Sequence, residues 1–132
     1  LINEAESIRA QVVDLSARLA GRDDMGEILA AGRTLDQALI DLEMGLTDLR
    51  LAGGQDSLRW PRQLLAKLTS LAGYIGGSDF PPTEQQLEVH EELQVLLADA
   101  QERMASIRNG ELAAMNRALL DSGLPHIMGG TP

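Results

Sequence analysis

Apolar residues recur at steps of three and four along most of the chain, the spacing that places side chains on one face of an α-helix. The first such stretch covers residues 2–19, with apolar positions at Ile2, Ala5, Ile8, Val12, Leu15 and Leu19. Gly21 follows, with Arg18 and Arg22 nearby, and glycine and cations both favour a helix C-terminus. We therefore predict one amphipathic helix that ends before Gly21.

A second stretch covers residues 25–51 and has the most regular pattern. Its apolar or small positions alternate steps of four and three: Ile28, Gly32, Leu35, Leu39, Leu42, Leu46 and Leu49. This is the seam of helices that pack in antiparallel bundles. At 1.5 Å per residue, the predicted helix is about 40 Å long, and Gly53-Gly54 would end it.

A third helix is predicted over residues 58–76, with Pro61 in its first turn, where the missing amide breaks no helical hydrogen bond. Asp79-Phe80-Pro81-Pro82 cannot continue a helix. Thr83 then begins a capping box with Gln86, which predicts the start of a fourth helix.

The fourth helix has apolar positions at Leu93, Leu97, Ala100, Met104 and Ile107. The next apolar residue is Leu112, a step of five, so we expect a kink near Asn109-Gly110. Gly123 and Pro125 end this helix.

These patterns predict an all-α, up-down bundle of about four helices over residues 1–125, followed by a tail at 126–132. Aromatic residues make up only 2% of the chain, so the core must be aliphatic, which suits interlocking helices better than a β-sandwich. The predicted core includes Leu15, Leu35, Leu39, Leu42, Leu46, Leu68, Leu93 and Leu97.

The net charge of −9 disfavours binding to nucleic acid or to anionic lipid, because both are negatively charged. The chain has no run of 18 apolar residues, so we expect no segment to span a membrane. The chain has no cysteine, which excludes disulfides, thiolate metal sites and a cysteine nucleophile.

Catalytic chemistry finds little support in the motifs. His90 lacks the Glu-x-x-His partner of a di-metal bundle, since position 87 is Leu, and Gln94 stands where a zinc-protease helix needs its second histidine. The acidic residues around Glu88 and Glu91 are typical of a solvated helix face. We expect no catalytic, metal-binding or cofactor-binding residue, and no enzyme activity.

One small basic and aromatic patch stands out in this acidic chain: Arg59, Trp60 and Arg62, with Lys67 beyond it. Cations at a predicted helix start oppose the helix dipole and therefore need compensation. Trp60 could pack in the core while the arginines pair with Asp56 or other acids. Alternatively Arg59, Trp60 and Arg62 form a partner-binding surface.

Residues 59–68 (Arg-Trp-Pro-Arg-Gln-Leu-Leu-Ala-Lys-Leu), with Leu71-Ala72-Gly73, Ser78-Asp79 and Pro82-Thr83, resemble the C-terminal helical region of bacterial sortilin-like (VPS10/BNR-repeat) β-propeller proteins, often labelled glycosyl hydrolases. Trp60 stands where that family usually has Phe. The resemblance extends to both flanks, including residues 112–116 and 123–125.

The resemblance implies a non-catalytic assembly or docking module of an exported bacterial protein, periplasmic or extracellular. Its partner would be an upstream β-propeller domain or a partner protein complex. The chain begins at Leu1 without Met, so we expect it to be a piece of a longer protein. The alternatives are a free-standing homo-oligomerising bundle and a metal-binding or catalytic bundle.

Overall fold

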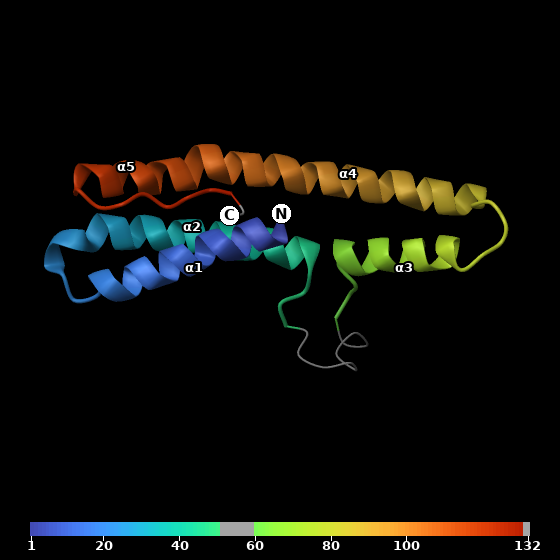
Figure 1. Ribbon diagram of the computed structural model, residues 1–132, viewed down its shortest axis with the longest axis horizontal. Helices are drawn as coiled ribbons and strands as arrows, with labels where there is room; N and C mark the ends of the chain where they lie inside the picture. The colour runs from blue at the N-terminus through green and yellow to red at the C-terminus, as the bar shows by residue number, and fades with distance from the viewer. Residues whose placement is uncertain (51–59, 131–132) are drawn as a thin grey trace. The chain divides into compact units, whose positions relative to one another are not determined.

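The computed structural model describes residues 1–50 and 60–130, and every regular element in these ranges is helical. The elements, in chain order, are α1 (Ile2–Leu19), the 3₁₀ turn η1 (Asp23–Met25), α2 (Gly26–Leu46), α3 (Leu64–Gly76), α4 (Glu84–Ile107), the π-helical turn η3 (Arg108–Leu112) and α5 (Ala113–Asp121). The last three follow one another without a break (Figure 1). The predicted all-α class is confirmed.

The helices divide into two compact units. Unit 1 comprises Leu1–Leu42 and the described residues from Arg103 onward, and unit 2 comprises the described residues of Glu43–Glu102. The boundaries fall within α2 and α4.

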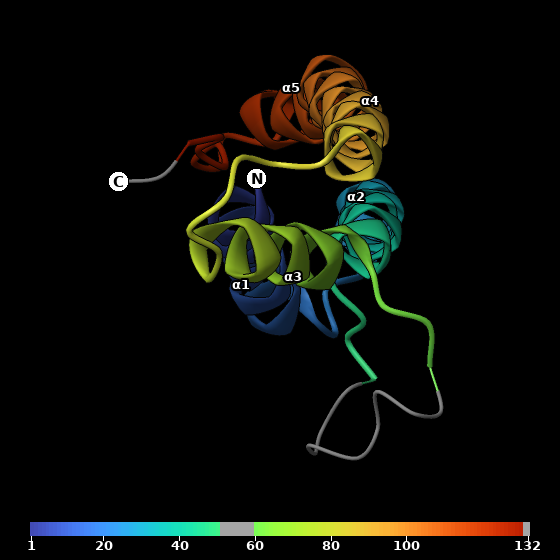
Figure 2. The same cartoon turned by 90° about the vertical axis from the view of Figure 1, so that its right-hand side faces the viewer.

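Unit 1 has an aliphatic core between α1, α2 and α5. Figure 2 shows these three helices viewed nearly along their axes. A β-carbon on Gly32 would lie 3.4 Å from Val12 Cγ1 on α1 and 3.5 Å from Met115 Cε on α5. These are ordinary van der Waals distances, so Gly32 lies where α1, α2 and α5 pack together. The fully buried large apolar side chains of unit 1 are Ile8, Leu35, Leu39, Met104, Ile107, Met115 and Leu119.

Ion pairs join α1 to its neighbours in unit 1. Arg9 Nε donates to Asp36 Oδ1 at 2.9 Å, which links α1 to α2. Arg108 donates to both carboxylate oxygens of Glu4, at 2.7 and 2.8 Å, which links η3 to α1. The Glu4 carboxylate raises the pKa of Arg108 through this side-chain hydrogen bond.

Helix ends in unit 1 follow the predicted glycines. Gly21, with φ of +83°, comes shortly after α1. Gly123, with φ of +68°, forms a Schellman motif after α5: its N–H bonds Leu120 O at 3.0 Å, and the N–H of Leu124 bonds Leu119 O at 2.9 Å.

The predicted irregularity near Asn109-Gly110 is the π-helical turn η3. A π-helix closes hydrogen bonds from i to i+5, so one turn takes about one residue more than an α-turn. The turn therefore absorbs the step of five between Ile107 and Leu112, and both side chains are buried.

In unit 2 the predicted capping box begins α4. The Thr83 N–H donates to Gln86 Oε1 at 2.9 Å, and the Gln86 N–H donates to Thr83 Oγ1 at 3.3 Å. The two residues thereby satisfy two amides that lack helical partners.

The predicted end of the second helix was wrong by five residues, because α2 ends at Leu46 and not at Leu51. The Asp48 carboxylate accepts a hydrogen bond from the Arg50 N–H at 3.0 Å. Such a side-chain bond competes with helical hydrogen bonding. Leu49, a predicted seam residue, is accordingly 47% exposed.

Five of the eight predicted core leucines are buried: Leu35, Leu39, Leu42, Leu46 and Leu93. Leu15, Leu68 and Leu97 are half-buried.

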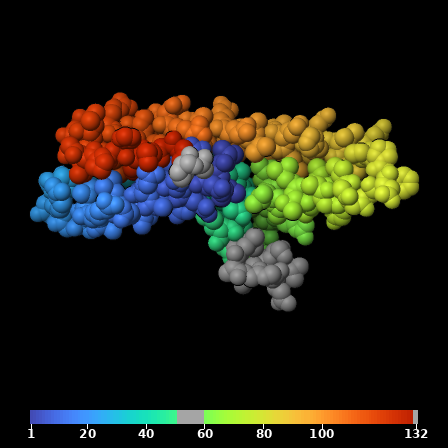
Figure 3. All heavy atoms as spheres, viewed as in Figure 1, coloured from blue at the N-terminus to red at the C-terminus, as the bar shows by residue number. Residues whose placement is uncertain are grey.

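The segment after α5 runs back along unit 1 (Figure 1). In the space-filling view its atoms lie against those of α1 and α5 (Figure 3). Ile127 is buried there, so part of the predicted tail packs against helices.

Candidate functional site

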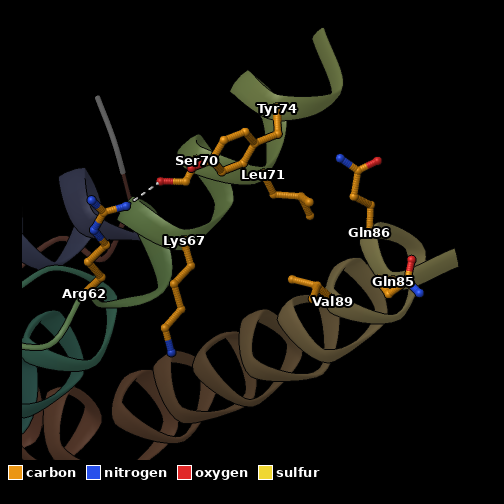
Figure 4. Close-up of a pocket in the computed structure, with 8 residues that line it drawn as sticks. All are labelled: Arg62, Lys67, Ser70, Leu71, Tyr74, Gln85, Gln86 and Val89. Atoms are coloured by element: carbon orange, nitrogen blue, oxygen red, sulfur yellow. Dashed lines mark hydrogen bonds between the residues drawn. The ribbon is translucent and has the colours of Figure 1, made fainter. Parts of the chain in front are cut away.

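Unit 2 has a groove of about 380 Å³ between α3 and α4. Figure 4 shows Leu71 of α3 and Val89 of α4 facing each other across it. The residues that line the groove are Arg62 before α3; Lys67, Ser70, Leu71 and Tyr74 on α3; and Gln85, Gln86 and Val89 on α4.

Local sequence explains why these residues share a groove. Ser70, Leu71 and Tyr74 follow Lys67 by three, four and seven residues, so one face of α3 presents all of them. The capping box fixes the first turn of α4, which carries Gln86. Residues 77–83 join the two helices, and the groove lies between them.

Two cations border this groove. Arg62 Nη1 donates to Ser70 Oγ at 3.1 Å, which holds the exposed guanidinium beside α3 (Figure 4). Within residues 1–50 and 60–130, neither Arg62 nor Lys67 forms an ion pair, whereas six other basic residues do: Arg9, Arg18, Arg22, Arg50, Arg103 and Arg108. The groove thus offers positive charge that no acid of the described chain neutralises.

The wall of the groove is apolar. Leu71 is buried, Val89 is exposed on the opposite helix, and Tyr74 is 71% exposed. A second groove of similar volume, between the α2–α3 connection and α3, shares Arg62 and Ser70 with the first. Arg62 therefore borders each of these two hollows.

This arrangement suits binding of a carboxylate beside apolar side chains. Guanidinium and ammonium groups form charge-assisted hydrogen bonds with carboxylates, while Leu71, Tyr74 and Val89 offer apolar contact. Among the described residues, no group of three or more histidine, aspartate or glutamate side chains could hold a metal ion. His90 is exposed.

The three predicted partner-binding residues have different positions. Arg59 lies outside the described residues. Arg62 borders the groove. Trp60 is half-buried and stacks on Arg50, whose Cζ lies 3.7 Å from the ring centroid.

The start predicted for the third helix was wrong, because α3 begins at Leu64 with Gln63 as its N-cap. Trp60 and Arg62 therefore precede the helix, and Pro61 does not lie in its first turn. Arg62 lies immediately before the N-cap and not within the first helical turn, where the helix dipole acts most strongly on a cation. Asp56, the alternative ion-pair partner, lies outside the described residues.

Sequence reasoning missed Asp48, whose buried carboxylate orients Arg50. It accepts hydrogen bonds from Arg50 Nε at 2.8 Å and Arg50 Nη2 at 2.7 Å, in addition to the Arg50 N–H. The Arg50 side-chain hydrogen bond lowers the pKa of Asp48 below its ordinary value of 3.8. Asp48 thus holds the guanidinium that stacks on Trp60.

This pair should make stability depend on pH. Since the pKa of Asp48 is lower in the folded chain, its carboxylate stabilises the fold above its ordinary pKa of 3.8, and this contribution is lost as pH falls through the lowered folded pKa. Asp48→Asn should therefore unfold at lower urea concentration than the wild type at pH 7. The difference should shrink from about pH 5 downward. An Asp48→Asn variant with a constant deficit from pH 7 to pH 3 would contradict this assignment.

Comparison of the chain with protein-family models and curated proteins, and of its structure with solved structures, finds no match. The groove is therefore interpreted from its own geometry. Within residues 1–50 and 60–130, every helix is too short or too polar to span a membrane.

Proposed function

We propose that this chain is a non-catalytic docking module, and that the groove between α3 and α4 binds an acidic segment of a partner protein. The observation that carries the proposal is the placement of Arg62 and Lys67. Both border an apolar groove, and neither forms an ion pair with a described residue of a chain that has 20 acidic side chains.

The positive charge of Arg62 and Lys67 favours an acidic segment as the occupant of the groove. The net charge of −9 repels anionic partners in general, so a local positive groove selects and orients the acidic part of a partner. The fork of Arg62 can donate two parallel hydrogen bonds to one carboxylate. Apolar residues of the same segment would contact Leu71, Tyr74 and Val89.

The size of the groove limits what binds there. About 380 Å³ lies near the lower end of the range for ligand pockets, so the groove accommodates a few side chains of a segment. Such a contact is small beside standard protein interfaces, and we expect modest affinity that weakens with salt.

The β-propeller context stays a prediction from the resemblance. Residues 59–68 and 71–73, which carry much of the resemblance, include Arg62, Lys67 and Leu71 of the groove. An exported protein with an upstream propeller would supply the acidic segment from its own chain or complex. Sequencing of the gene upstream of Leu1 tests this: propeller repeats would support it, and a different domain would contradict it.

A second candidate is a homo-oligomer, and one observation favours it. Unit 2 exposes many large apolar side chains, which a second copy could cover. They are Leu49, Leu65, Tyr74, Phe80, Leu87, Val89, Val95 and Leu96. Sedimentation equilibrium distinguishes the two, since the docking proposal expects a monomer that binds peptide and the alternative expects a concentration-dependent dimer.

Selection from a random 12-residue peptide library tests the docking proposal. Peptides retained by the wild-type chain should be enriched in Asp and Glu with interspersed apolar residues. The double variant Arg62→Glu, Lys67→Glu should lose at least about tenfold in affinity for them, since both attractive charges become repulsive.

The matched control reverses two other cations, Arg33 and Arg117, which are exposed and form no ion pair within the described residues. The variant Arg33→Glu, Arg117→Glu has the same net charge as the groove variant and should retain most of the affinity. Equal losses in both variants would show a general charge effect. Selected peptides without acidic enrichment would also contradict the proposal.

A further inference from the structure

The segment that follows α5 is held on unit 1 through its backbone. Asn116 Nδ2 on α5 donates to the Ile127 carbonyl at 2.9 Å, and the Ile127 N–H donates to Asn116 Oδ1 at 2.7 Å. Gln11 Nε2 on α1 donates to the Met128 carbonyl at 3.1 Å, and the Met128 N–H donates to Gln11 Oε1 at 3.0 Å. Two side-chain amides from two helices thus pair with two successive peptide units.

These four hydrogen bonds recognise the peptide backbone of the segment. A primary amide carries a donor and an acceptor side by side, so each one satisfies both the N–H and the C=O of a single residue. A neighbouring strand in an antiparallel sheet makes the same paired contact. Backbone recognition of this kind is independent of the side chain at each position.

Side-chain selectivity comes from the surroundings of the same residues. Ile127 is 4% exposed, so the site has a pocket for an aliphatic side chain, while Met128 is 65% exposed. A β-carbon on Gly129 would lie 3.0 Å from Leu112 Cδ2, so the Leu112 side chain would have to shift to admit a larger residue. The site therefore selects an aliphatic residue, accepts any residue at the next position, and favours glycine at the third.

We propose that unit 1 carries a peptide-binding site formed by Gln11, Asn116 and Leu112, with the chain's own residues 124–130 as its resident ligand. When this segment is displaced, the site takes a peptide of the same class, aliphatic-x-Gly, from another molecule. The seated segment itself is the evidence for the occupant, because it shows which chemistry fits.

The resident segment regulates access to the site. Tethered by the short Gly123–Pro125 connection, it has an effective concentration of about 1 mM or more. A free peptide of equal intrinsic affinity therefore binds the wild-type chain only weakly. Release of the segment exposes the site.

The test uses the full chain with Ile127→Asp, which places a charge in the aliphatic pocket and releases the segment. The probe is a fluorescein-labelled peptide Leu-Pro-His-Ile-Met-Gly-Gly, which copies residues 124–130. Fluorescence anisotropy should show binding to this variant at least tenfold tighter than to the wild type. Adding Asn116→Ala and Gln11→Ala to the variant should remove the binding.

Peptide variants provide matched controls. A probe with Ala at the Met position should bind equally, because Met128 is exposed. A probe with Asp at the Ile position should not bind, and a probe with Leu at the first Gly should bind more weakly, because Leu112 must shift to admit it. Circular dichroism checks that the chain variants stay helical. If Ile127→Asp fails to fold, Gly129→Val serves in its place, since the added side chain clashes with Leu112.

Two results would overturn the proposal. One is a folded, segment-released chain that binds no probe. The other is binding that persists without Asn116 and Gln11, which would show that the segment merely packs against apolar helix surface.

Discussion

Insertion of one alanine after Gly110 should destabilise unit 1 by at least about 3 kcal/mol, because it turns buried side chains away from the core. The π-helical turn already accommodates a step of five from Ile107 to Leu112, and no regular helix closes a turn of six residues. Everything after the insertion would rotate by roughly 100°. Leu112, Met115 and Leu119, all buried, would lose their contacts together.

Deletion of Gly110 is the matched control and should change stability by less than about 1 kcal/mol. With one residue removed, an unbroken α-helix places the same three side chains four, seven and eleven residues after Ile107, on its own face. Urea denaturation followed by circular dichroism measures both variants. If the deletion costs as much as the insertion, the π-turn does not serve to keep the apolar residues in phase.

Replacement of Leu35 by alanine should cost about 2–5 kcal/mol, because the side chain is fully buried in unit 1 and its removal leaves a cavity. Leu35 lies on α2 one turn after Gly32, where α1 and α5 approach closely. The surrounding helices can therefore collapse into the cavity only in part. The same urea experiment measures the loss.

Leu49→Ala provides an unusually close control. Both leucines occupy the same predicted seam, and both variants remove the same atoms, but Leu49 lies after α2 and is 47% exposed. We expect a change within about 0.5 kcal/mol for Leu49→Ala. Equal losses would mean that α2 extends to Leu51, as the sequence pattern predicts.

Much of the fold could be predicted because local chemistry and apolar spacing agree. The stretch predicted over residues 2–19 coincides with α1, and the Thr83–Gln86 capping box forms as predicted. The step of five between Ile107 and Leu112 identified the position of the π-turn. In each case the pattern that predicts the element lies within a single short segment of the sequence.

Errors arose where a competing interaction overrides apolar spacing. The bond from the Arg50 N–H to the Asp48 carboxylate accompanies the early end of α2, and spacing alone cannot indicate that bond. Three other features also depend on residues far apart in sequence. They are the division into two units, the burial of Ile127 and the hydrogen bonds between Gln11 and Met128. Such contacts become visible only in three dimensions.

The candidate site was predicted in part. The patch pointed to Arg62, which does border the groove. Its neighbours Ser70 and Tyr74 share a helical face with Lys67, a signal that spacing on α3 could have provided. Gln86 and Val89 could not be assigned to the site, because pairing of α3 with α4 across a groove is a tertiary feature.

The most direct test of the docking proposal is a two-dimensional ¹H–¹⁵N NMR titration of the wild-type chain with the tightest acidic peptide from the library. The proposal predicts that the amides of Ser70, Tyr74 and Val89 shift most, that Gln11 and Asn116 stay unchanged, and that 0.5 M salt suppresses the shifts by screening Arg62 and Lys67. Because Gln11 and Asn116 report on the separate peptide site of unit 1, the two proposals can fail independently. Shifts that cluster away from α3 and α4, or that persist at high salt, would contradict the account.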